Sequence, residues 1–204
     1  MKTNIYIDGF NLYYGCIKDT SYHWLDVSKM CGLLLPNDRI HKIKYFTALV
    51  SARPNDPEQP VRQQLFLRAL KTIPNLEIIL GTFLSHEVKM PLSPIGSGYA
   101  KVIKTEEKGS DVNIATHLLV DGFRNDYELA VVVSNDSDLL LPIQVVTQQF
   151  KKPVGLLNPQ KHTSVALLPH VQFVKKIRGT VLKNSLFPDV LNDKDGQFSK
   201  PAGW

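Results

Sequence analysis

Two predicted strands of this chain end in aspartate, and that placement points to metal-dependent chemistry. Asp136 and Asp138 follow the apolar run Leu129–Val133, which is short and rich in β-branched residues and therefore predicts a buried strand. Asp8 directly follows a second such run, Thr3–Ile7. Open α/β sheets bind ligands at the carboxyl ends of their strands, so we expect these carboxylates to share one pocket.

A fourth carboxylate, Asp111, stands in the first turn of a predicted helix that Ser110 is expected to cap. Carboxylates packed together repel one another, and at least one pKa rises unless a cation is present. Oxygen ligands of this kind are typical of Mg²⁺ or Mn²⁺. Each aspartate alone is explained as well by a turn or a helix cap, so the prediction depends on all four together with Asn11.

The segments between these motifs alternate between strand and helix, which predicts a parallel sheet with crossover helices. The expected strands are 3–7, 41–50, 76–84, 129–133, 153–157 and 171–174, and the expected helices are 12–18, 27–35, 61–73, 111–123 and 139–150. The segment 85–108 interrupts the alternation with Pro, Gly and Lys, and it predicts a hairpin or an extended loop. A functional role and a plain surface excursion account for it equally well.

Length and composition limit the class of protein to which this chain can belong. A chain of 204 residues that is 43% hydrophobic suits a single α/β domain, and the formal charge of +5 is compatible with a polyanionic partner without requiring one. Cys16 and Cys31 are expected to be reduced core thiols. We see no signal peptide and no apolar stretch near the length of a membrane span, so we expect a cytoplasmic protein with no membrane partner. Residues 181–204 lack periodicity and are expected to be poorly ordered.

Three motifs carry a resemblance to a known family. Tyr6–Leu12 (YIDGFNL), Lys108–Val112 (KGSDV) and Val133–Leu139 (VSNDSDL) resemble, in the same order, the signatures of the NYN domain, a LabA/DUF88-like branch of the PIN-like nuclease superfamily. The resemblance extends from about residue 3 to 175. Many relatives have Gly in place of Asn135, Phe in place of Leu139 and Asp in place of His117, so one further carboxylate of the family is missing here.

The resemblance implies a Rossmann-like, PIN-like three-layer α/β sandwich with a central, mostly parallel sheet over residues 1–180. It also implies a ribonuclease that hydrolyses RNA phosphodiester bonds with water activated by Mg²⁺ or Mn²⁺. On this resemblance the metal-binding and catalytic residues are Asp8, Asp111, Asp136 and Asp138. Asn11 matches the polar residue that follows the family's first strand.

Further residues are candidates for contacts with RNA. We assign substrate binding to Asn11, Ser134 and Asn135 near the aspartates, and to Lys101, Lys104 and Lys108 of the irregular segment, which could contact phosphates. Tyr13, Tyr14 and Tyr99 could stack on unpaired bases, although helical burial explains the first two equally well.

The sequence leaves one alternative function open and disfavours another. A non-catalytic RNA-binding or regulatory adaptor could keep the acidic pocket for structural reasons, and the sequence leaves this alternative and a homo-oligomeric state open. A haloacid-dehalogenase-type phosphatase requires a second Asp two residues after the first, where this chain has Phe10, so that class is disfavoured.

Overall fold

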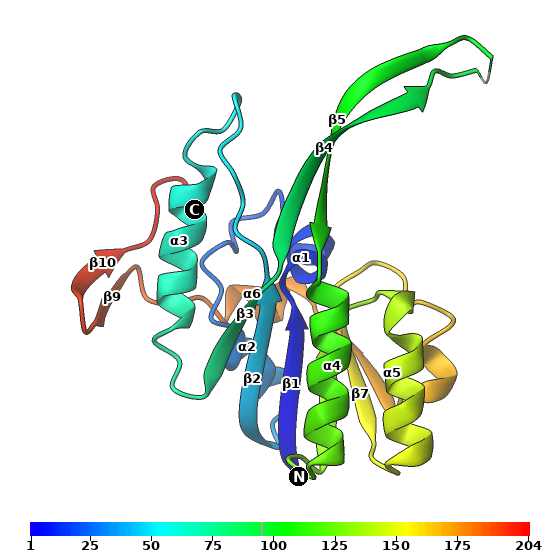
Figure 1. Cartoon of the computed structure of the whole chain (residues 1–204). Coiled ribbons are helices and arrows are strands. Elements are labelled where there is room, and N and C mark those ends of the chain that lie inside the picture. The colour runs from blue at the N-terminus through cyan, green and yellow to red at the C-terminus, as the bar shows by residue number, and fades with distance from the viewer. Residues whose placement is uncertain (95) are drawn as a thin grey trace.

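The computed structural model describes residues 1–94 and 96–204, and a six-stranded parallel sheet is its centre (Figure 1). The strand order is β3-β2-β1-β6-β7-β8. The strands are β1 (Lys2–Asp8), β2 (Arg39–Thr47), β3 (Leu76–Leu80), β6 (Leu129–Val133), β7 (Val154–Asn158) and β8 (Phe173–Lys176). All neighbouring pairs in this sheet are parallel, which confirms the predicted α/β class.

Helices cover both faces of the sheet. One face packs against α4 (Ser110–Phe123) and α5 (Leu140–Gln144), which lie in front of the sheet in Figure 1. The other face packs against α1 (Gly9–Leu12), α2 (Val27–Leu34), α3 (Gln59–Leu70) and α6 (Gly179–Lys183). Short π-helical segments, Tyr13–Ile17 and Val145–Gln149, continue α1 and α5, and 3₁₀ turns occupy Ser137–Leu139 and Leu168–His170.

Side chains of the central strands contribute to two separate hydrophobic cores, one on each face of the sheet. Along β1, Ile5 and Ile7 belong to the cluster under α2 and α3, whereas Tyr6 belongs to the cluster under α4 and α5. Every residue of β6 is buried in the same alternating way. Because side chains alternate across a strand, a strand covered on both faces is apolar throughout, which explains the continuous run Leu129–Val133.

A two-stranded antiparallel ribbon projects from the body of the domain (Figure 1). It consists of β4 (Thr82–Pro91) and β5 (Tyr99–Lys108), so the hairpin alternative for segment 85–108 is confirmed. The single strand expected over 76–84 is wrong, because the chain leaves the parallel sheet at Gly81 and starts the ribbon there. A Cβ at Gly81 would lie 2.8 Å from the carbonyl oxygen of Lys108, so the close approach of the two strands requires glycine.

The C-terminal segment differs from the expectation of poor order over 181–204. It continues α6 and then forms a hairpin of β9 (Val190–Asp193) and β10 (Gly196–Ser199). Phe187 and Phe198 are buried against Trp24, whose indole Nε1 donates to the carbonyl of Pro188 at 2.8 Å. Two isolated aromatic residues leave no periodic pattern, which is why this packing could not be predicted from the sequence.

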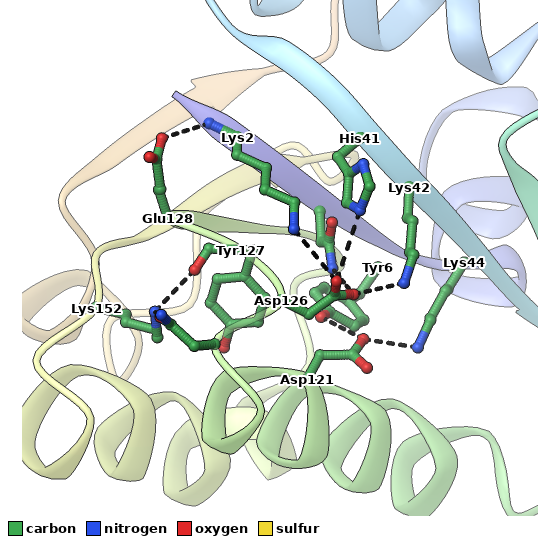
Figure 2. Close-up of polar contacts among 12 residues, drawn as sticks. Lys2, Tyr6, His41, Lys42, Lys44, Asp121, Asp126, Tyr127, Glu128 and Lys152 are labelled. Atoms are coloured by element: carbon green, nitrogen blue, oxygen red, sulfur yellow. Dashed lines mark hydrogen bonds and ion pairs between the residues drawn. The ribbon is translucent and has the colours of Figure 1, made fainter.

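A polar network, which we call the matched network, lies between α4 and the strands β1 and β2 (Figure 2). Its members are Lys2, Lys42, Lys44, Asp121 and Asp126. Lys44 Nζ lies 2.6 Å from Asp121 Oδ2, and the Tyr6 hydroxyl donates to the same oxygen at 2.8 Å. Lys42 Nζ and Lys2 Nζ approach the Asp126 carboxylate at 2.6 and 3.3 Å. Each carboxylate here has at least one lysine partner.

None of the helices in the described part of the chain is both long and apolar enough to span a bilayer. Cys31 is buried and Cys16 is half-buried, and both are free thiols, as expected.

Candidate active site

Asp8 lies where β1 ends and α1 begins. Its Oδ1 accepts a hydrogen bond from the backbone N–H of Asn11 at 2.9 Å, so the carboxylate caps α1. Its Oδ2 accepts from the Ser134 hydroxyl at 3.1 Å, across from the end of β6. Gly9 lets the chain turn sharply after Asp8, because a Cβ there would lie 2.7 Å from the Phe46 carbonyl oxygen. The carboxylate is therefore fixed between two neighbouring strands.

Asp111 stands in the first turn of α4, directly after the projecting ribbon. The expected Ser110 cap is wrong: Gly109 holds the N-cap position with φ of 99°, a left-handed conformation that favours glycine. Ser110 instead donates its backbone N–H and its hydroxyl to Glu107 Oε1, at 3.2 and 2.9 Å. Glu107 thus anchors the start of α4 and brings one more carboxylate next to Asp111.

The turn after β6 supplies the remaining two aspartates. Asp136 accepts from the backbone N–H of Asp138 at 2.9 Å and caps the short 3₁₀ turn that follows. Its own backbone N–H donates to Ser134 Oγ at 3.1 Å. Asp136 is half-buried and Asp138 is exposed. Asp136 is thus a capping residue as well as a member of the acidic cluster, by which we mean Asp8, Asp111, Asp136 and Asp138.

The charges of the acidic cluster act on one another. Burial raises the pKa of Asp8 to about 6, against the hydrogen bonds from Asn11 and Ser134, and the charges of Asp111 and Asp136 add to the rise. Burial also raises the pKa of Asp111, and Asp136, Glu107 and Asp138 raise it further. Among the residues that the structure describes, no lysine or arginine forms an ion pair with any of the four. The structure thus brings the predicted aspartates together without a matching cation from the protein.

The donor set fits a divalent metal in type, since it consists of carboxylate oxygens. However, within residues 1–94 and 96–204 no three His, Cys, Asp or Glu side chains are arranged to hold a metal ion as they stand. Metal binding here requires side-chain rotation toward a common centre. Asp136 and Asp138, which are half-buried and exposed, have the freedom to make that rotation.

The neighbouring polar residues tie the loops together. Asn11 Oδ1 accepts from the backbone N–H of Asn135 at 3.1 Å, which joins the loop after β1 to the loop after β6. The side chain of Asn135 spans to the next loop, where it donates to the His162 carbonyl and accepts from the Ser164 backbone N–H. Asn11, Ser134 and Asn135 therefore all have bonds that shape the site, whether or not they also meet a substrate.

The three candidate lysines lie on β5 and do not share one face of the ribbon. Residues 104 and 108 alternate with residue 101 along the strand, so Lys101 projects to the opposite side. Lys104 and Lys108 both contact the Glu106 carboxylate, at 2.5 and 3.2 Å, and Lys101 contacts Glu87 at 2.7 Å. The sequence showed the crowding of these lysines but not their pairing with glutamates.

His117, the position of the missing family carboxylate, lies away from the acidic cluster. Its Nδ1 is 2.9 Å from Lys44 Nζ, and its ring makes an edge contact with Phe46. Burial and the charge of Lys44 lower the pKa of His117. This histidine belongs with the matched network beneath α4.

A cavity of about 660 Å³ adjoins the acidic cluster, and it was not predicted from the sequence. Gly9 and Phe10, which follow Asp8, form part of its wall, and so does Glu107. The other walls come from the start of α3, the root of the ribbon and the C-terminal residues 202–204. Such a wall, assembled from segments far apart in the chain, has no local sequence pattern.

Comparisons with known proteins agree with the motif resemblance. The model of the NYN domain matches residues 2–175 of this chain. A solved structure of a protein of unknown function from Vibrio parahaemolyticus superposes with a TM-score of 0.58 at 20% identity, covering 91% of this chain and 96% of that one. This structural likeness supports the fold and carries no functional information.

A curated relative has an oxidative activity in its name. It is 6-hydroxy-3-succinoylpyridine 3-monooxygenase HspA of Pseudomonas putida, 29% identical over 187 residues. The match covers 78% of this chain and 60% of the relative, so this chain spans well under two thirds of that protein's length.

Proposed function

The chain belongs to the NYN-domain family, and from that premise we propose that it is a metal-dependent ribonuclease whose acidic cluster hydrolyses RNA phosphodiester bonds. One observation carries the proposal. The ends of β1 and β6 and the start of α4 bring Asp8, Asp111 and Asp136 close enough that neighbouring carboxylates raise the pKa of Asp8 and of Asp111, and no cation of the described residues offsets them. A fold maintains such repulsion only at a cost, which a divalent cation would remove.

Different residues of the protein would bind the metal and the RNA. Asp8, held by Asn11 and Ser134, is the fixed ligand, and Asp111, Asp136 and Asp138 complete the set after rotation. A bound Mg²⁺ or Mn²⁺ supplies Lewis-acid activation of water and stabilises charge on the phosphate. Lysines of the ribbon would contact flanking phosphates, with Lys104 and Lys108 acting on one face and Lys101 on the other.

The test is cleavage of single-stranded RNA with Mn²⁺, with Mg²⁺ and with EDTA. We expect cleavage with either metal, none with EDTA, and none in Asp8→Asn, which keeps the size of the side chain and its hydrogen bond to Asn11. Asp126→Asn is the matched control, because it removes an aspartate outside the acidic cluster. Residual cleavage by a nuclease-free preparation of Asp8→Asn would contradict the mechanism. RNA binding without any cleavage would favour the adaptor alternative.

A second candidate function comes from the curated relative. The cavity that adjoins Asp8 has an aromatic wall and could admit a small aromatic compound, and the relative's name gives oxygenation as the reaction to test. Conversion of 6-hydroxy-3-succinoylpyridine in the presence of O₂ and a reductant, by a preparation that does not cleave RNA, would support this candidate over the ribonuclease.

A further inference from the structure

The cavity next to the acidic cluster is lined by aromatic rings that keep accessible surface. Six of them are partly buried or exposed: Phe10, Tyr13, Tyr14, Phe66, Phe83 and Trp204. Phe10 and Phe83 meet edge-to-face with ring centroids 5.6 Å apart, which joins the loop after β1 to the root of the ribbon. Phe66 and Trp204 make a similar contact at 6.2 Å. Rings gathered around an open space of this kind indicate a ligand.

The charges of the lining favour a neutral occupant. Arg53 and Arg62 line the cavity together with Asp56 and Glu107, so the formal charges cancel. Arg62 is already bound to both oxygens of Asp56, at 2.6 and 2.7 Å. Glu107 is occupied by the start of α4. A free aromatic acid would have to compete with Asp56 for Arg62, whereas a neutral planar ring meets no such competition.

The position of the cavity links it to the proposed chemistry. Gly9 and Phe10 directly follow Asp8, and Glu107 lies close enough to Asp111 to raise its pKa. The volume of about 660 Å³ lies within the range of small-ligand pockets and admits a planar heterocycle. Tyr14, 54% exposed, adds an accessible ring to its wall. An RNA strand with one phosphate at the acidic cluster would therefore place an adjacent nucleotide at this cavity.

We propose that the aromatic cavity binds one unpaired nucleobase of the RNA, next to the phosphate held at the acidic cluster. This rests on the proposed ribonuclease function and adds a position where the enzyme senses the base. Stacking on Phe83 and Tyr14 supplies the affinity, because every base has a π-face that aromatic side chains accept. Paired bases are excluded, since a duplex keeps its bases stacked on each other.

The test measures binding with Ca²⁺ in place of Mg²⁺ or Mn²⁺, because Ca²⁺ also takes oxygen ligands, after a gel has shown that the RNA stays intact. The probes are a fluorescein-labelled seven-nucleotide RNA and versions with an abasic nucleotide at each successive position. We expect the abasic substitution to weaken binding roughly 5- to 150-fold at one position and little elsewhere. Phe83→Ala and Tyr14→Ala should remove that difference. Phe123→Ala, an exposed ring at the far end of α4, is the matched control and should retain it.

The outcomes separate this inference from the proposed function. A position-dependent abasic effect in a protein that does not cleave RNA with Mn²⁺ would support the base site and contradict the ribonuclease. Cleavage with equal binding of all the abasic RNAs would overturn the base site alone. Displacement of the intact RNA by a free aromatic acid, without any abasic effect, would assign the cavity to a small molecule and also overturn the inference. Unaltered melting temperatures of the variants exclude misfolding.

Discussion

Helix α4 carries an aspartate near each end, and the two meet opposite electrostatic surroundings. Asp111, in the first turn, faces other carboxylates of the acidic cluster, and burial and these charges raise its pKa. Asp121, in the last turn, lies 2.6 Å from Lys44 and accepts from the Tyr6 hydroxyl. The helix dipole favours a carboxylate at the N-terminus and opposes one at the C-terminus. The lysine partner is therefore found at the end of α4 where the helix dipole does not stabilise a carboxylate.

The comparison shows that this fold does provide lysines for buried carboxylates. The matched network places three of them on β1 and β2 (Figure 2). The acidic cluster, at the carboxyl ends of β1 and β6 and the start of α4, has none in the described residues. A structural role would be served by matched charges, and the unmatched set is the contrast on which the proposed metal site depends. The four predictions below test this contrast, beginning with the largest effect.

Asp121→Asn should destabilise the fold by about 3 kcal/mol, because it leaves the Lys44 ammonium buried without a counter-charge. Urea unfolding at pH 7 measures the change. The double variant Lys44→Met, Asp121→Leu should recover most of the loss, since replacing both partners by apolar groups is often neutral. A single-variant loss below about 1 kcal/mol would show that this pair behaves like a surface ion pair.

Asp8→Asn should do the reverse and stabilise the metal-free protein at pH 8, by about 2–3 kcal/mol. The pKa of Asp8 in the folded state, about 6, exceeds that of an unfolded aspartate, so ionisation costs stability. The cost is complete above pH 6 and disappears below about pH 4. The gain of the variant should therefore shrink to nothing as the pH falls from 6 to 4. Urea unfolding at pH 8, 6 and 4 checks it, and a gain independent of pH would count against unmatched charge as its cause.

Mn²⁺ should raise the thermal stability of the wild type, by about 1.4 kcal/mol at ten times the dissociation constant. Asp136→Asn should weaken that response, because it removes a ligand of the acidic cluster. Asp126→Asn should lower the starting stability and keep the full response to metal. An unchanged melting temperature of the wild type in millimolar Mn²⁺ would contradict the proposed metal site.

Lys42→Met should give the smallest change, a loss of about 0.5–1 kcal/mol at pH 7, since this pair is partly exposed. Although burial opposes ionisation of Asp126, hydrogen bonds from Lys42, Asn4 and Lys2 hold its pKa below the usual range. The contribution of the pair is present above the unfolded pKa near 4 and is lost as the pH falls further. The variant and the wild type should therefore converge near pH 2 in urea titrations, and also in 1 M NaCl at pH 7.

Much of the fold and the candidate site could be predicted because the signals are local. The β-branched run before Asp136 predicts its strand, and the parallel sheet puts Asp8 and Asp136 at the same edge, since β1 and β6 pair directly. The expected helix over 27–35 is present as α2, and Asp26 caps it by accepting from the Lys29 backbone N–H at 3.0 Å. The end of the strand at Leu80 was missed because Leu76–Leu80 and Thr82–Leu84 are both extended and differ only in their partners.

Sequence by itself determined the α/β class and the presence of aspartates at strand ends, because backbone propensity and hydrophobic periodicity act over a few residues. Only the tertiary structure decided which carboxylates have partners. Lys42 meets Asp126 across 84 positions, and Lys44 meets Asp121 across 77. Whether a charge is matched depends on which side chains the sheet order brings within reach, and no local pattern encodes that distance. The same holds for the aromatic cavity, whose walls come together only when the ribbon, α3 and the C-terminal segment pack around Asp8.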